Sequence, residues 1–449
     1  MKAIGIDIGT TTISVVVLDT EKQMVLDSRT ISNGTFLDTG KEWERIQDVE
    51  KIVPKVIEVL EELLGQHDDI QTIGLTGQMH GIMYINKEGK CISPLYTWQD
   101  GRGNLPDKDG ITLTERIAKQ TGISVYTGYG LVTHLYQCSI GAVPEEAVAI
   151  CTIGDYIGMC LTGRKRPLMH ASNAASLGFF DVEAGEYQTA VLKKLGMDVS
   201  LLPQVCYEYE TLGSYQGIPV TVALGDNQAS FLGSVGMEEG TLLLNMGTGG
   251  QISVLSSQYL AKQGIETRPF IKDKYLLVGA SLCGGRAYAI LEKFLRNYEK
   301  ACREKENKNI TETFIQEVSP QYEIMEQLAR KGMDQKDSMR VTTTFNGTRQ
   351  EPALRGRIDN LSEDNFTPEG LIYGVLEGMV RELYEMFQII QENTGIRAVK
   401  LVASGNGFRR NAVLQEIAAR MFGAKLTLAL YQEEAACGAA VSSTFHILP

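Results

Sequence analysis

The chain has 449 residues, of which 43% are hydrophobic and 22% charged, the balance of a folded globular protein rather than a disordered or fibrous one. This length exceeds one ordinary hydrophobic core and predicts two domains of roughly 200 residues each. The formal net charge of −12 argues against a nucleic-acid-binding surface, although backbone amides and a metal ion can still bind small anions on an acidic protein.

Cysteine usage and hydropathy indicate a cytoplasmic protein. The eight cysteines form no CxxC pair or Cys/His cluster, which argues against structural zinc and fits a reducing compartment. Asp7 interrupts the apolar run that a signal peptide would need, and no segment approaches the roughly 20 apolar residues of a membrane span. We therefore expect no nucleic-acid or membrane partner. The sequence leaves the oligomeric state open, with a homodimer as one alternative.

The first predicted element is a strand, a turn and a second strand. The turn Gly9-Thr10-Thr11-Thr12 lies between the apolar residues 4–8 and 13–18, whose density predicts strands. Glycine lets the backbone approach a phosphate, so that amide N–H groups and threonine hydroxyls can donate to its oxygens. Asp7 would repel that phosphate unless a cation intervened, so it predicts Mg²⁺; hydrogen bonding to the turn amides is the alternative.

A helix over residues 51–64 and a strand over residues 72–76 precede two polar segments. Gly77-Gln78-Met79-His80-Gly81 is rich in groups that bind hydroxyls, with a buried core histidine as the alternative for His80. Thr97-Trp98-Gln99-Asp100-Gly101-Arg102 combines a ring, an amide, a carboxylate and a guanidinium, a mixture that suits a polyol. A structural turn anchored by Trp98 is the competing interpretation.

Asp226 stands between a strand predicted over residues 220–224 and a helix predicted over residues 227–235. Ligand groups converge at such strand ends in α/β sheets. A carboxylate there can take the proton of a sugar hydroxyl as it attacks the γ-phosphorus of ATP. Capping of the helix N-terminus is an equal alternative, and it does not exclude catalysis.

A second copy of the turn follows a domain boundary predicted near residues 236–240. Residues 244–254 repeat the apolar run, the short polar residue, the Gly-Thr pair of Gly247-Thr248-Gly249 and the Ile-Ser-Val ending, with one extra residue in the turn. One such turn alone is usually a hairpin. Two copies half a chain apart predict similar domains that face each other across a ligand-binding cleft.

Two glycine segments in the second half are expected to border an adenine. Gly284-Gly285 follows a strand predicted over residues 275–280, and Ser404-Gly405-Asn406-Gly407 follows one over residues 401–403. The second segment precedes a helix predicted over residues 408–421. A further helix is predicted over residues 368–391, and residues 299–309 are expected to be a solvated helix surface or loop. The chain contains no GxxxxGK[ST] P-loop and no complete GxGxxG fingerprint, which disfavours both folds.

In combination and in order, these motifs resemble the FGGY family of carbohydrate kinases over nearly the whole chain, most closely its branch that phosphorylates sedoheptulose. The resemblance implies an α/β fold of two RNase H-like domains of the actin/hexokinase type with a central cleft. Residues 1–236 would form the sugar-binding domain and residues 237–449 the nucleotide-binding domain. Mg²⁺ and ATP would bind in the cleft, and Asp226 would be the general base that helps convert sedoheptulose to sedoheptulose 7-phosphate.

The resemblance also assigns individual positions. Asp7 and Asp226 match the positions that bind Mg²⁺. The positions that would contact the sugar are Gln78, Met79, His80, Trp98, Asp100, Asn173 and Asp226. The positions that would contact ATP are Gly9, Thr10, Thr11, Thr12, Gly247, Thr248, Gly249, Gly285, Gly405, Asn406 and Gln415. D-Xylulose or another polyol is the alternative acceptor, an ATP-driven switch like actin or Hsp70 is the alternative from another class, and a catalytically dead sugar sensor is the third.

Overall fold

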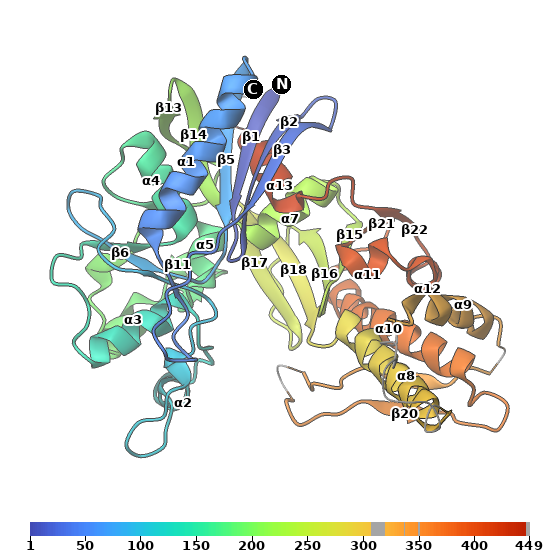
Figure 1. Ribbon diagram of the computed structural model, residues 1–449. Coiled ribbons are helices and arrows are strands. Elements are labelled where there is room, and N and C mark those ends of the chain that lie inside the picture. Colours follow the sequence, from blue (N-terminus) through green and yellow to red (C-terminus); the bar gives the residue numbers. More distant parts are fainter. Residues whose placement is uncertain (307–318, 336, 349–350, 446–449) are drawn as a thin grey trace. The chain divides into compact units, whose positions relative to one another are not determined.

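The computed structural model describes residues 1–306, 319–335, 337–348 and 351–445, which divide into two compact units (Figure 1). Unit 1 contains Met1–Met237, Arg268–Tyr275 and the residues from 431 to 445. Unit 2 contains Glu238–Thr267 and the described residues of Leu276–Leu430. The predicted division into 1–236 and 237–449 differs from this grouping in two places. Arg268–Tyr275 belongs to unit 1, where the Pro269 carbonyl accepts a hydrogen bond from Gln228. At the C-terminal end, helix α13 (Glu434–Ser442) packs against helix α7 (Asp226–Val235) and strands β1 (Lys2–Ile8) and β5 (Ile70–Gly77).

Unit 1 is built on a six-stranded sheet with the order β13-β14-β5-β1-β2-β3. Strand β1 runs antiparallel to β2 and parallel to β5, which in turn runs parallel to β14. The strands of this sheet are β1 (Lys2–Ile8), β2 (Thr12–Asp19), β3 (Met24–Ser32), β5 (Ile70–Gly77), β13 (Thr211–Tyr215) and β14 (Ile218–Gly225).

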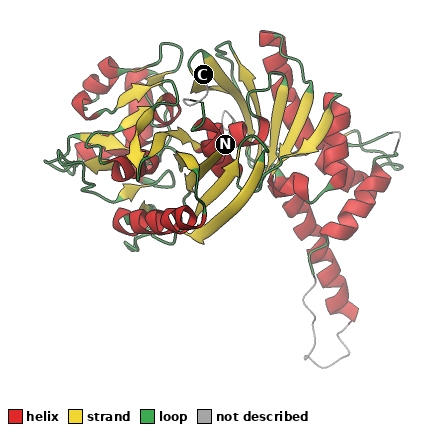
Figure 2. Ribbon diagram, turned by 90° about the horizontal axis from the view of Figure 1, so that it is seen from above, coloured by secondary structure: helices red, strands yellow, loops and turns green. Residues whose placement is uncertain are grey.

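Helices cover both faces of this sheet, which is why β1 is apolar along nearly its whole length (Figure 2). Ile6 shares a core with Ile52 of α1 (Val49–Gln66), whereas Ala3 on the other face packs with Cys437 of α13. Helix α13 lies so close to β1 that only glycine fits at Gly5, where a Cβ would be 1.8 Å from the carbonyl oxygen of Ala436. The small side chains of α13 therefore allow backbone-to-backbone packing.

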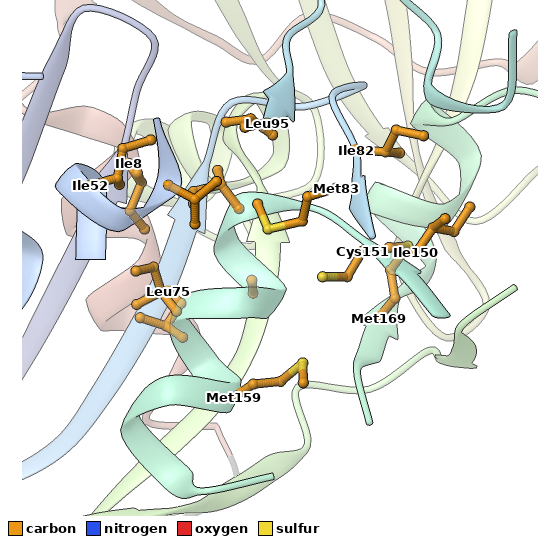
Figure 3. Packing of buried hydrophobic residues seen from close by; sticks show 14 of the residues in the cluster. Ile8, Ile52, Leu75, Ile82, Met83, Leu95, Ile150, Cys151, Met159 and Met169 are labelled. Atoms are coloured by element: carbon orange, nitrogen blue, oxygen red, sulfur yellow. The ribbon is translucent and has the colours of Figure 1, made fainter. Parts of the chain in front are cut away.

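The core of unit 1 extends from the sheet into the segments between its strands. Figure 3 shows Ile8 and Leu75 of the sheet together with Met83 and Ile150 from the β6–β8 pair. The smaller elements of this unit are β4 (Ile46–Gln47), β6 (Met83–Ile85), β7 (Leu95–Tyr96), α2 (Leu113–Thr121), α3 (Gly130–Ser139), β8 (Ala149–Cys151), α4 (Ile153–Thr162), β9 (Leu168–His170), α5 (Ala171–Ser176), β10 (Phe180–Asp181), β11 (Glu186–Tyr187), α6 (Thr189–Lys194), β12 (Gln204–Cys206) and α7 (Asp226–Val235), with short 3₁₀ helices at Arg102–Asn104 and Val199–Leu201.

Unit 2 repeats the central strand order of unit 1. Its sheet has the order β17-β18-β16-β15-β21-β22, in which β15 runs antiparallel to β16 and parallel to β21. The succession β3-β2-β1-β5-β14 therefore matches β18-β16-β15-β21-β22, and the predicted duplicated α/β fold is confirmed. The elements are β15 (Thr241–Met246), β16 (Gly250–Ser256), β17 (Ile265–Ile271), β18 (Lys274–Ser281), α8 (Gly285–Glu306), α9 (Tyr322–Gly332), β19 (Arg340–Thr342), β20 (Arg357–Asp359), α10 (Pro368–Thr394), β21 (Lys400–Ser404), α11 (Gly405–Arg409), α12 (Ala412–Phe422) and β22 (Lys425–Leu428).

One predicted element of unit 2 is wrong. The helix expected over residues 408–421 is split into α11 and α12, because Asn411 begins the second helix as its N-cap. The Asn411 side chain accepts a hydrogen bond from the Leu414 amide at 2.8 Å, which replaces the continuation of the first helix. The other predicted helices and strands lie within observed ones, and the segment predicted over 299–309 is helical to residue 306, with the rest outside the described residues.

The last feature of the fold concerns the length and apolar character of its helices. None of those in the described ranges combines the length and the apolar character needed to cross a membrane.

Candidate active site

The two Gly-Thr turns connect antiparallel strands at matching places in their sheets. Ile8 pairs with Ile13 across the first turn, whereas Met246 pairs with Gly250 across the second. The first turn therefore spans residues 9–12, and the second spans only residues 247–249. The prediction that the second turn is longer is wrong, since its extra residue lengthens the strand pairing instead. Thr11 and Thr12 of the first turn are exposed, and the Gly9 carbonyl accepts a hydrogen bond from Asn33 at 2.8 Å.

The two predicted carboxylates lie at the same edge of the unit 1 sheet. Asp7 of β1 and Leu224 of β14 both pair with Thr76 of β5, from opposite sides. Asp226 follows two residues after Leu224, as the first residue of α7. Because parallel strands end at a common edge, the register brings Asp7 and Asp226 to one region.

Asp226 does not cap its helix. Gly225 occupies the N-cap position and makes no side-chain hydrogen bond there, so the capping interpretation of Asp226 is wrong. The Asp226 Oδ1 atom instead accepts a hydrogen bond from the side-chain Nδ2 atom of Asn227 at 2.9 Å. The backbone amide of Asn227 also bonds to this carboxylate, so the first turn of α7 orients it.

A third carboxylate, from Glu433, reaches the same region. Burial, together with the negative charges of Asp226 and Glu433, raises the pKa of Asp7 to about 7. Burial also raises the pKa of Asp226 to about 6, against the opposing effects of Asn227 and the positive charge of Arg268. Glu433 is held by the Thr30 hydroxyl, which donates to its Oε1 atom at 3.0 Å. Sequence reasoning missed Glu433, because it comes from a segment far away in the chain.

These carboxylates fit a divalent cation that keeps most of its ligands outside the protein. The mutual repulsion that raises the pKa of Asp7 is what a bound cation would relieve. No group of three or more His, Cys, Asp or Glu side chains within the described residues is arranged to hold a metal ion by itself. Mg²⁺ commonly binds through one or two carboxylates, with water and phosphate oxygens as its other ligands, so Asp7 and Asp226 suit it.

A ring of hydrogen bonds joins the first turn to the predicted sugar-binding side chains. The Thr10 hydroxyl donates to Gln78 Oε1 at 3.2 Å, Gln78 Nε2 donates to Gln47 Oε1 at 2.8 Å, and Gln47 Nε2 donates back to the Thr10 carbonyl at 2.9 Å. The indole N–H of Trp98 also donates to the Thr10 hydroxyl at 3.0 Å. Trp98 keeps 48% of its surface exposed, so its ring is not the core anchor considered above. Gln47 was not predicted, since a single buried amide on a two-residue strand has no periodic signature.

His80 is held in an unusual backbone conformation. Its φ angle is 71°, a left-handed value that a residue other than glycine rarely adopts. Its ring stacks on Tyr129 with centroids 5.0 Å apart, and its Nδ1 atom donates to the Ser176 carbonyl at 2.6 Å. That bond places a proton on Nδ1 and leaves Nε2 as the acceptor of the neutral ring. Its neighbour Met79 is buried and receives a contact from the Asn227 amide nitrogen at 3.7 Å.

Asp100 is fully buried and heavily bonded. Arg102 donates to Asp100 Oδ1 at 2.6 Å from Nε and to Oδ2 at 3.0 Å from Nη2, a bidentate pair. Backbone amides of Arg45 and Arg102 donate to the same two oxygens. Both carboxylate oxygens are therefore engaged by the protein, and the predicted contact between Asp100 and a sugar stays a prediction.

Asn173 lies on α5 against the end of β14. Its Nδ2 atom donates to the Ala223 carbonyl at 2.9 Å, and the residue is 2% exposed. Its Oδ1 atom is buried and has no hydrogen-bond partner among the described residues. An unpaired buried acceptor is costly unless a ligand supplies the donor, which suits the hydroxyl of a bound sugar.

The second turn is enclosed by backbone rather than side chains. The Gly285 and Arg286 amides donate to the carbonyls of Gly247 and Thr248 at 2.9 and 3.0 Å. Gly249 lies against Gly284, where a Cβ on Gly284 would be 2.4 Å from the Gly249 carbonyl carbon. These contacts dock the start of α8 directly on the turn and leave no room for larger residues.

Unit 2 contains a pocket of about 790 Å³ beside this turn. The predicted nucleotide contacts among its lining residues are Gly247, Thr248, Gly285, Gly405 and Asn406. Gly407, from the segment expected to border the adenine, also lines the pocket. The lining residues not predicted are Met246, Arg286, Tyr288, Ala289, Tyr322, Glu326, Leu376, Met379, Arg410, Asn411 and Leu414. Gly249 and Gln415 do not line it, and Gln415 instead donates to the Phe408 carbonyl at 2.7 Å. The volume and the glycine-rich wall suit a nucleotide.

Comparison with known proteins agrees with this architecture. The sequence model of the FGGY family of carbohydrate kinases, N-terminal domain, matches residues 2–233, and that of the C-terminal domain matches residues 242–445. The chain belongs to the FGGY family of carbohydrate kinases. It is therefore a sugar-phosphorylating enzyme, which decides against the ATP-driven switch.

The relatives of this FGGY kinase are named for different sugars. It is 28% identical to the sedoheptulokinase of Mus musculus over 93% of this chain and 92% of that protein. It is 25% identical to the xylulose kinase of Staphylococcus xylosus over 98% of this chain and 89% of that protein. The solved xylulose kinase of Rhodospirillum rubrum has the same fold, with a TM-score of 0.80, 20% identity and coverage of 100% of this chain and 90% of that one.

Proposed function

We propose that this FGGY kinase transfers the γ-phosphoryl group of ATP to the terminal hydroxyl of a ketose, and that the ketose is sedoheptulose. The observation that carries the proposal is Asp226, a carboxylate that lies at a strand end beside Asp7. Burial raises the pKa of Asp226 to about 6. A base whose pKa lies near the working pH can take a proton efficiently. The similarity to a sedoheptulokinase supports the choice of sugar, and D-xylulose is the second candidate because a xylulose kinase is nearly as similar.

In the proposed reaction, the sugar oxygen forms a bond to the γ-phosphorus while the bond between that phosphorus and the ADP oxygen breaks. Asp226 accepts the proton of the attacking hydroxyl. Asp226 lies at the strand edge as the first residue of α7, and its bonds to Asn227 orient the carboxylate for this step. Positioning and electrostatic stabilisation supply most of the catalysis in such transfers.

Asp7 and Asp226 would hold Mg²⁺, with Glu433 adding negative charge beside Asp7. The ion, when bound, would neutralise charge on the phosphate oxygens. The chain's own contribution is to keep the carboxylates buried and close together, so that the cation binds more tightly than it would at exposed side chains. The Thr30 hydroxyl keeps Glu433 oriented toward this region.

The two units would divide the substrates, with the sugar on unit 1 and the nucleotide on unit 2. On unit 1, Asn173 Oδ1 would accept a hydrogen bond from a sugar hydroxyl, His80 would contact the sugar, and the exposed ring of Trp98 would cover the carbon chain. Gln78, Met79 and Asp100 would shape the site around them. On unit 2, the pocket beside Thr248 would bind the adenosine end of ATP. Both substrates are small molecules of the cytoplasm, where we expect the enzyme to act.

The decisive experiment measures ADP release with ATP and a panel of C5 to C7 ketoses, in the wild type and in Asp226→Asn. We expect sedoheptulose to give the highest kcat/KM, and Asp226→Asn to lose turnover by about 10²-fold or more while it still binds the sugar. A higher kcat/KM for D-xylulose would transfer the assignment to that sugar. Near-normal turnover in a folded Asp226→Asn variant would remove Asp226 from the role of base, and sugar binding without any turnover in the wild type would indicate a sugar sensor.

A further inference from the structure

The end of β14 lacks a neighbouring strand on one side, just before Asp226. Strand β13 pairs with residues 218–221 of β14, and the Val222 amide then donates to the Glu210 carbonyl at 2.8 Å. From Ala223 onward, side chains of helix α5 take the place of the missing strand. Asn173 donates to the Ala223 carbonyl, and the Ser172 hydroxyl accepts from the Gly225 amide at 2.9 Å.

Residues 223–225 of β14 are held on their other side by β5. Leu224 and Gly225 pair with Thr76 and Gly77, and the Thr76 hydroxyl donates to the Leu224 carbonyl at 2.8 Å. The backbone that leads into Asp226 is therefore fixed on both edges. Ser172 makes the contact nearest to Asp226 on the open edge, because it binds the amide of the preceding residue.

Ser172 is itself oriented by a buried histidine. The Ser172 hydroxyl donates to His170 Nδ1 at 2.8 Å, because that nitrogen is an acceptor for the Ser172 backbone as well. The Ser172 amide also donates to His170 Nδ1, at 3.1 Å. His170 and Ser172 are both buried, and burial lowers the pKa of His170 to about 4, so the ring stays neutral and its Nδ1 stays an acceptor.

Gly225 needs such an external restraint. A Cβ at this position would lie 2.7 Å from Cε of Met79 and 2.7 Å from Oε1 of Gln228, so a larger residue would require these two side chains to move. Glycine has the most conformational freedom of any residue, and Gly225 is also the N-cap of α7 without a side-chain cap of its own. On the open edge of β14, the bond from the Gly225 amide to Ser172 is therefore the restraint nearest to Asp226.

We propose that Ser172, supported by His170, is a positioning residue for Asp226 in catalysis. This inference rests on the proposed role of Asp226 as the base. Removal of the hydroxyl frees the Gly225 amide and lets the first residue of α7 shift. A shift of about 1 Å at a catalytic group can cost up to about 10²-fold in rate, while the substrates still bind.

The test compares Ser172→Ala with Ser172→Thr, which keeps a hydroxyl, using ADP release with sedoheptulose and ATP. We expect Ser172→Ala to lower kcat by about 10-fold or more, with KM for both substrates changed less than about twofold. Ser172→Thr should recover most of the lost kcat. If Ser172→Ala does not fold, Ser172→Cys, whose thiol is a weak acceptor, should show a smaller loss of kcat.

Thr221→Val is the matched control, because it removes another buried hydroxyl next to the same part of the sheet. Thr221 lies on β14, and its hydroxyl donates to the Ile73 carbonyl at 3.4 Å. It should lower Tm without lowering kcat. A wild-type kcat in the folded Ser172 variants, or an equal loss of kcat in Thr221→Val, would overturn the positioning role. Asp226→Asn is measured alongside, to separate a failure of the positioning role from a failure of the base role. An inactive Asp226→Asn together with a fully active Ser172→Ala would keep Asp226 as the base and reject only the role of Ser172.

Discussion

The two Gly-Thr turns repeat one backbone plan but are surrounded by different chemistry. The first follows Asp7 and is enclosed by polar side chains, among them Gln47 and Gln78. The second follows Asn245, whose amide donates to the Ser404 hydroxyl at 2.8 Å, and is enclosed by the backbone of Gly284 and Gly285. One copy thus follows a carboxyl group, and the other follows an amide.

This difference shows how a duplicated fold can divide one reaction. In the proposed reaction both turns would offer backbone amides to phosphate oxygens, which needs only the shared glycine geometry. The carboxylates that would hold a cation and accept a proton are confined to unit 1, where Asp7 and Asp226 lie at one sheet edge. The nucleotide-sized pocket is in unit 2, beside the neutral turn. An exchange of the two polar residues before the turns would test this division directly.

The largest effect is expected from Asp7→Asn, which gives the first turn the residue of the second. We expect kcat to fall by about 10²–10³-fold, because the proposed Mg²⁺ loses a charged ligand. Circular dichroism should show an intact fold, since the substitution also removes repulsion among the buried carboxylates. Activity measured against Mg²⁺ concentration should show a weaker dependence that saturates at higher metal. Asp27→Asn on β3 of the same sheet serves as the control, and wild-type activity in Asp7→Asn would show that the two turns are chemically equivalent.

The reciprocal change, Asn245→Asp, should have a smaller effect. It places a carboxylate beside the proposed phosphate site on the neutral turn, so KM for ATP should rise by about 10-fold, which corresponds to about 1.4 kcal/mol of lost binding. KM for the sugar is the internal control and should stay unchanged. An unchanged KM for ATP would separate the second turn from the nucleotide.

The smallest expected effect concerns the pH dependence of stability in unit 1. Burial raises the pKa of Asp155 to about 7, above its ordinary value of 3.8. A carboxyl with a raised folded-state pKa adds stability that is complete below pH 3.8 and is lost as the pH rises through about 7. Asp155→Asn removes this dependence but can keep the bonds from Thr152 that cap α4.

From pH 6 to 8 the wild type should therefore lose about 1 kcal/mol of unfolding free energy relative to Asp155→Asn. Urea unfolding followed by tryptophan fluorescence measures it, because Trp43 and Trp98 both belong to unit 1. If the unfolding free energies of the two proteins change in parallel with pH, the pKa of Asp155 is not raised in the folded state.

Much of the fold was predictable from local patterns, and less of the site. The paired turns, the strand before Asp226 and most helices follow from apolar periodicity and glycine placement within about ten residues. The break between α11 and α12 was missed, although Asn411 is a typical N-cap, because the apolar pattern continues across it. Three site residues were missed: Glu433, Gln47 and Tyr288. Each is a single polar or aromatic residue outside any motif, so its own sequence neighbourhood does not indicate a site.

The duplication, the Gly-Thr composition of both turns and the place of Asp226 between a strand and a helix could all be read from the sequence. Those features depend on residues that are neighbours in the chain, where backbone geometry links residue type directly to structure. Only the tertiary structure decided that α13 belongs with unit 1, that Glu433 lies near Asp7, and that Ser172 holds the amide before Asp226. These contacts join segments far apart in the chain, and they arise from close packing of glycine and alanine backbones that no local pattern specifies.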